Sequence, residues 1–63
     1  MADADQPREV YFEFVAIGGS VKVVAIDAAT GTEVTVIGPA NAAQSDLQRL
    51  ALGKLKLKLA KRL

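Results

Sequence analysis

The sequence predicts an α+β domain in which three antiparallel strands are followed by one C-terminal helix. Three segments rich in β-branched and aromatic residues lie within residues 9–37, and short glycine-containing turns separate them. Loops this short join neighbouring antiparallel strands, so the order in the sheet is expected to follow the chain. Beyond these segments the chain is leucine-rich, and its length and leucine spacing favour a helix.

The chain is too short to form a large core. Its 63 residues leave room for one domain, which we expect over residues 9–63, after a polar and disordered arm at residues 1–8. A chain of this size buries only about 60% of the surface that it exposes when unfolded. It contains no cysteine and no histidine, so neither a disulfide nor a conventional zinc site supplements the core. Self-association remains, and we expect a homodimer.

The first strand is expected at residues 9–17. Its alternation places Phe12 and Phe14 in the core, on the face that meets the helix. Gly18-Gly19 then supplies residues free to adopt the positive φ angles of a tight hairpin turn.

The second and third strands are expected at residues 21–27 and 33–37. Asp27 can bond back to the backbone of the turn between them, and Gly31 suits a left-handed position that closes a short loop. Pro39 cannot donate a hydrogen bond to a neighbouring strand, so pairing is expected to stop there.

The helix is expected to end at about Arg62, and two residues compete to cap its start. Asn41 has Gln44 three residues on as a capping-box partner, and Ser45 offers a rival start four residues later. Lysine and leucine alternate over residues 54–59, which is typical of a strand. The capping signal and the overall leucine spacing nevertheless favour a helix.

Several of these segments recur together in a known family. They are Val-Tyr-Phe-Glu-Phe at residues 10–14, Val-Lys-Val at 21–23, Ala-Ile-Asp at 25–27, Thr-Gly-Thr-Glu-Val at 30–34 and Gly-Pro at 38–39. In them the chain resembles, over about residues 8–62, a family of short uncharacterised alphaproteobacterial proteins with a domain of unknown function. The resemblance implies a bacterial, cytosolic protein of the same fold, and it brings no activity and no functional residue. The lysine–leucine alternation departs from the family's helix.

The composition argues against catalysis. Without histidine or cysteine, the commonest general base and the best nucleophile are both missing, and we expect no enzymatic activity, no cofactor and no metal. The start of the chain is acidic and polar, unlike a signal peptide, and no apolar run approaches the length of a membrane span. We therefore expect a cytoplasmic protein that binds no membrane.

The predicted sheet is apolar on both faces, although one helix can cover only one of them. A large apolar patch on the other face usually marks an interaction site. The alternative is that β-branched residues occur there for their strand propensity alone. The sheet residues expected in an interface are Tyr11, Val15, Ile17, Val24, Ile26 and Ile37.

The predicted helix carries two leucine stripes, whereas a helix packed on a small sheet needs one. We expect the second stripe to pack on another surface. The short connection at residues 38–40, stiffened by Pro39, suggests that each helix packs between its own sheet and the sheet of a partner chain. Full exchange of the helices between two chains is one form of this arrangement, and packing on the same chain alone is the alternative. The helix residues expected in the interface are Leu50, Leu52, Leu55 and Leu59.

Charge is distributed unevenly along the chain. Residues 1–46 hold all seven acidic residues and two basic ones, whereas residues 47–63 hold six basic residues and no acidic one. The basic end either contacts a polyanion or is a solvated helix end that complements the helix dipole. The residues that would contact a polyanion are Lys54, Lys56, Lys58, Lys61 and Arg62.

These observations favour a homodimeric structural or protein-interaction module, whose partner is a second copy or another protein. The alternative is non-specific nucleic-acid binding through the basic helix. Lys22 is the one basic residue in the predicted strands, so the sheet offers no arginine for reading bases.

Overall fold

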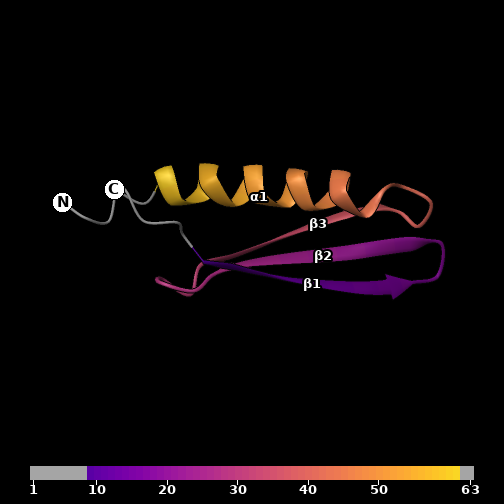
Figure 1. Cartoon of the computed structure of the whole chain (residues 1–63), viewed down its shortest axis with the longest axis horizontal. Helices are drawn as coiled ribbons and strands as arrows, with labels where there is room; N and C mark the ends of the chain where they lie inside the picture. Colours follow the sequence, from indigo (N-terminus) through magenta and orange to yellow (C-terminus); the bar gives the residue numbers. More distant parts are fainter. Residues whose placement is uncertain (1–8, 62–63) are drawn as a thin grey trace.

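The computed structural model describes residues 9–61, which form three strands and one helix (Figure 1). The elements are β1 (Val10–Ile17), β2 (Ser20–Asp27), β3 (Glu33–Pro39) and α1 (Gln44–Ala60). The strands are antiparallel and lie in the order β1-β2-β3. The predicted α+β fold, a three-stranded meander followed by a helix, is confirmed. The predicted disordered arm at residues 1–8 lies outside the described residues.

The turn between β1 and β2 needs a glycine at its first position. Gly18 has a φ of 58°, in the left-handed region, and Ile17 pairs with Ser20 across the two turn residues. A two-residue hairpin with glycine at the first position matches the right-handed twist of the strands on either side. The turn thereby fixes the register that sets Phe14 opposite Val23.

The turn between β2 and β3 is organised by Asp27, as the sequence predicts. Its carboxylate accepts hydrogen bonds from the backbone N–H of Thr30 (3.1 Å) and from the Thr30 hydroxyl (2.7 Å). The Gly31 N–H donates to the Asp27 carbonyl oxygen (2.8 Å), with Gly31 at a φ of 75°. The Asp27 side chain is buried, and these bonds satisfy its carboxylate.

Strand pairing continues to Pro39, which corrects the expectation that pairing stops at Gly38-Pro39. Ser20 lies opposite Pro39, and beyond it the Ala40 N–H donates to the Gly19 carbonyl oxygen (2.9 Å). Backbone groups of an antiparallel strand point alternately toward and away from its neighbour. Pro39 occupies a position that points away from β2, so its missing N–H removes no bond from the sheet.

The helix begins with neither of the predicted capping residues. Gln44 is its first residue, and Ala43 precedes it without a side-chain capping bond. The backbone N–H groups of Asp46 and Leu47 donate to the Ala43 carbonyl oxygen (3.0 and 3.2 Å). The helix ends at Ala60, earlier than predicted, and the lysine–leucine segment is helical throughout.

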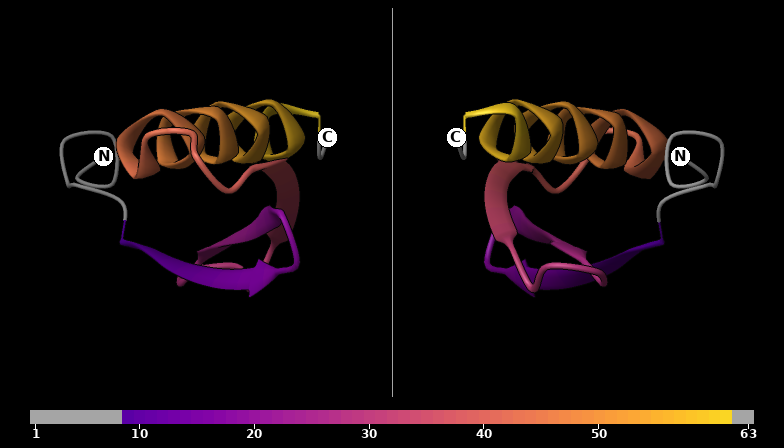
Figure 2. Two further views of the ribbon diagram at one scale, coloured as in Figure 1. Left: turned by 90° about the vertical axis from the view of Figure 1, so that its right-hand side faces the viewer. Right: turned by 90° about the vertical axis from the view of Figure 1, so that its left-hand side faces the viewer.

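The core lies between α1 and two of the three strands. One stripe of α1, formed by Leu47, Ala51 and Leu55 at intervals of four residues, packs on buried residues of β2 and β3. Figure 2 shows that the sheet curves, with β3 close to the helix and β1 farthest from it. At the end of β3, a Cβ atom on Gly38 would collide with the Leu47 side chain, so this glycine permits the helix to dock closely.

Candidate interaction surface around β1

Strand β1 is the least covered strand of the sheet on its helix-facing side. Val10, Phe12 and Phe14 pack against the core cluster but are only half-buried. Phe12 and Phe14 lie on the side of the sheet that faces the helix, as predicted, but they are half-buried and do not belong to the buried core. The reason is the position of α1, which packs on β2 and β3 and leaves the two phenylalanines at the margin of the core.

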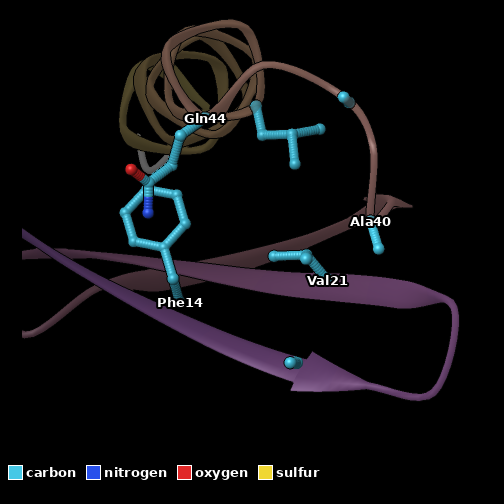
Figure 3. A pocket seen from close by; sticks show the side chains of 7 residues that line it. Phe14, Val21, Ala40 and Gln44 are labelled. Carbon is cyan, nitrogen blue, oxygen red and sulfur yellow. The ribbon is translucent and has the colours of Figure 1, made fainter.

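A pocket of about 310 Å³ opens beside this margin, where the start of α1 passes over the ends of β1 and β2 (Figure 3). Phe14 rises from β1 toward the side-chain amide of Gln44 at the start of the helix. The pocket is lined by Phe14, Ala16, Val21, Ala40, Ala42, Gln44 and Leu47. Gln44 is the one polar side chain among them, so the pocket suits an apolar group.

The backbone of β1 has an outward side that no described segment pairs. The Glu9 carbonyl oxygen accepts from the Ala28 N–H (3.0 Å), which shows that odd-numbered residues of this segment bond to β2. The even-numbered residues therefore point their N–H and C=O groups away from the sheet. We call this row the open edge; it is formed by Val10, Phe12, Phe14 and Ala16.

The opposite edge of the sheet is occupied by side chains. The Lys54 ammonium donates to the Thr35 carbonyl oxygen (2.7 Å), and the Lys58 ammonium donates to the Glu33 carbonyl oxygen (3.1 Å). Both oxygens point outward from β3, as the Asp27 N–H bond to the Thr32 carbonyl oxygen indicates. Pro39, at the end of the strand, offers no N–H. We call this row the closed edge.

The outer face of the sheet, opposite the helix, is apolar in part. Tyr11, Ile17 and Ile37 are each more than half exposed. Val15 and Ile26 are half-buried, whereas Val24, on the central strand, is only 8% exposed. Of the sheet residues predicted for the interface, Val24 is therefore the one that is already buried within its own chain.

The Tyr11 hydroxyl has a partner on this face. Its hydrogen bond to the Glu9 carboxylate and the negative charge of that carboxylate raise the pKa of Tyr11 above its usual value of 10.0.

The helix residues predicted for the interface lie in different environments. Leu50 is exposed, and Leu52 and Leu59 are half-buried. Leu55 is 0% exposed within the single chain, and its assignment to an interface stays a prediction. It follows Ala51 by four residues and therefore belongs to the stripe that packs on the sheet.

The helix packs on the sheet of its own chain, and the connection before it is not strained. No described non-glycine residue has a positive φ. The Ala42 N–H donates to the Pro39 carbonyl oxygen (3.0 Å), which closes a compact turn. The strain that suggested an exchange of helices is therefore not found.

The residues predicted to contact a polyanion differ in whether they already make a bond. Lys54 and Lys58 are exposed and bond to β3. Lys56 and Lys61 are exposed and make no such bond, and Arg62 lies outside the described residues. Arg49 lies 3.7 Å from Asp46 on the helix surface. The sequence does not predict the contacts of Lys54 and Lys58 with the sheet.

Residues 9–61 contain neither a metal-binding cluster nor a membrane-spanning helix. This part of the chain contains no group of three or more acidic, histidine or cysteine side chains that could hold a metal ion. It also contains no helix with the length and apolar character required to cross a membrane.

Comparison with known proteins identifies one family. The family described as "Domain of unknown function (DUF6898)" matches residues 7–62, almost the span over which the resemblance was seen in the sequence. No curated protein and no solved structure matches the chain.

Proposed function

We propose that this chain, which belongs to the DUF6898 family of domains of unknown function, is a small interaction module that acts as a homodimer. The observation that carries the proposal is the exposure of β1. Its phenylalanines are half-buried on one side, Tyr11 and Ile17 are exposed on the other, and its open edge is unpaired by any described segment. Exposed strand edges and contiguous apolar surface are features by which proteins associate.

The make-up of the core supports the same proposal. The buried apolar residues are valines, leucines and alanines, while Phe12, Phe14 and Tyr11 all lie outside this set. Aromatic side chains have the largest apolar area to bury, and they are enriched where proteins meet. A second chain would cover what the single helix leaves exposed.

Nucleic-acid binding through the helix has less support. Lys54 and Lys58 bond to backbone carbonyl oxygens of β3, so a phosphate would have to compete with bonds already made. Binding that depends on phosphate contacts weakens steeply with salt.

Sedimentation equilibrium at micromolar concentrations tests the proposal. We expect a species of twice the 6.6 kDa chain mass, with little dependence on salt because the residues of β1 are apolar apart from Glu13. A 6.6 kDa species over the whole range would overturn it. A gel-shift series in increasing salt, run on the same sample, tests the nucleic-acid alternative.

A further inference from the structure

We infer that two copies of the chain associate through β1, edge to edge and antiparallel, so that their sheets join into one sheet of six strands, three from each copy. The inference rests on the proposed function, since it names the contact by which the homodimer forms. The partner it assigns to the open edge is a second copy of the same chain.

The difference between the two edges limits the assembly to two chains. A two-fold axis places a strand antiparallel to its own copy, which gives a regular hydrogen-bonded pair. A second open edge would allow further chains to add and form a fibre. Lys54, Lys58 and Pro39 occupy the other edge, so each chain has one place to pair and the assembly closes as a dimer.

The charges and side-chain faces restrict the register. The two cores are continuous only if both helices lie over the same face of the joined sheet. Each helix-facing residue of β1 must then pair with a helix-facing residue of the other copy. An axis through Glu13 would set two carboxylates side by side on the outer face, and like charges directly opposite one another are destabilising. An axis through Phe14 avoids this contact.

The same register places a large side chain of one copy opposite a small side chain of the other. It sets Phe12 of each copy opposite Ala16 of the other, a small residue at the mouth of the pocket beside α1. The apolar ring then meets an apolar pocket. On the outer face it sets Tyr11 opposite Ile17, two side chains that are each more than half exposed in the single chain. Aromatic and β-branched pairs of this kind stabilise neighbouring strands.

Proline substitution at matched positions of the two edges tests the pairing. Ala16→Pro removes an outward N–H at the open edge and leaves every bond to β2 in place, and Ile37→Pro does the same at the closed edge. We expect Ala16→Pro to raise the dimer dissociation constant about tenfold or more and Ile37→Pro to leave it unchanged. Sedimentation equilibrium measures the constant, and circular dichroism checks that both variants fold. A dimer equally tight in both variants would overturn edge pairing and leave the proposed homodimer standing. A monomeric wild-type chain would overturn both.

Cysteine cross-linking tests the register and does not depend on how well the proline variants fold. The chain has no cysteine of its own, so single-cysteine variants are unambiguous. Phe14→Cys places two thiols across the axis, where paired Cα atoms lie about 5.5 Å apart, within disulfide range. Phe12→Cys loses the same ring but lies off the axis. We expect rapid disulfide-linked dimer for Phe14→Cys and little for Phe12→Cys. Equal or faster linkage of Phe12→Cys would overturn the register.

Discussion

The edge of the sheet formed by β3 and the edge formed by β1 differ in what the helix supplies to them. Beside β3, α1 buries the core and also places Lys54 and Lys58 on outward carbonyl oxygens. Beside β1, the helix supplies only partial cover and places no ammonium group on the strand edge, and two phenylalanines remain half-buried. One helix therefore determines both which half of the sheet is stable alone and which half is free to meet a partner.

The spacing of helix and strand makes the lysine contacts regular. Four helical residues rise about 6 Å, and two strand residues span nearly the same distance. Lys54 and Lys58 are four residues apart, and their acceptors on Thr35 and Glu33 are two residues apart in the opposite direction. A helix antiparallel to β3 thus brings both ammonium groups to the edge together.

The largest expected effect lies in the covered half. Leu55→Ala deletes most of a fully buried side chain and is expected to cost about 2–5 kcal/mol, enough to unfold much of so small a domain. Leu57→Ala, on the same helix at 64% exposure, is expected to change stability by no more than about 0.5 kcal/mol. Urea denaturation of both variants measures the difference. Similar losses for the two would show that the helix is rotated from the position described.

The junction of helix and β3 is expected to tolerate little change. Gly38→Ala forces a methyl group against the buried Leu47 side chain and is expected to destabilise the fold by about 1–3 kcal/mol. Gly53→Ala is the matched control, because a Cβ there meets nothing and alanine favours a helix by about 1 kcal/mol. Thermal melting is expected to shift downward for the first variant and upward for the second. A rise for both would mean that Leu47 does not hold the helix against β3.

Opening the closed edge tests what the lysines do. The double variant Lys54→Met, Lys58→Met keeps side chains of similar length and removes the bonds to β3. We expect a small change in stability, about 1 kcal/mol or less, because both bonds are exposed. We also expect larger oligomers by light scattering at raised concentration, since both edges would then be open.

Lys56→Met is the control for charge in that experiment, because Lys56 is exposed and, unlike Lys54 and Lys58, makes no bond to β3. Large oligomers from the control as well would attribute the effect to lost charge, and no oligomers from the double variant would contradict the role of the lysines.

The smallest expected effect concerns Tyr11, on the outer face of β1. The raised pKa means that the folded chain holds the phenol proton more firmly than the unfolded chain, so any stabilisation is present below pH 10 and is lost as pH rises through the folded pKa. Tyr11 is the only tyrosine, so ultraviolet absorbance follows it alone. We expect its midpoint to lie above 10.0 and to fall in Glu9→Gln. A midpoint that is the same in both proteins would contradict the bond to Glu9.

The strands were predictable because the turns between them have little freedom. Gly18 and Gly31 take φ angles that other residues rarely adopt, and Asp27 bonds within its own turn. These local requirements place the strand ends to within a residue or two. The sequence does not predict the pairing of Pro39, because proline usually ends a strand, whereas at an outward-facing position it removes no bond to the neighbouring strand.

The helix was less predictable because its leucines occur around much of its surface. Lysine–leucine alternation places Leu55 and Leu57 on different sides, and the pattern does not say which one meets the sheet. Packing of Leu47 over Gly38 decides the rotation, and that contact joins two elements. The start at Gln44 follows from the same contact, since no side chain caps it.

The open edge was missed for a geometric reason. A helix about 10 Å across covers roughly two strands spaced about 4.8 Å apart, so one strand of three must be left at the margin. The short connection after β3 places the helix over β3 and β2, which leaves β1. The predicted interface residues Tyr11 and Ile17 are exposed on β1, and their role in an interface remains a prediction. Ile37 is also exposed, but it lies on β3, and pairing through β1 would leave it outside the interface.

The turn held by Asp27 also bears on how quickly the chain folds. Its hydrogen bonds join residues at most five positions apart, and the Thr32 N–H adds another to the Thr30 hydroxyl (3.2 Å). Closure of a loop of about ten residues takes roughly 10–100 ns, and this turn is shorter. Each later strand pairs with the one before it in the chain. Chains dominated by contacts between sequence neighbours fold in about milliseconds or less. For the proposed dimer, the slow event is then expected to be the encounter of two folded chains, whose rate falls with dilution.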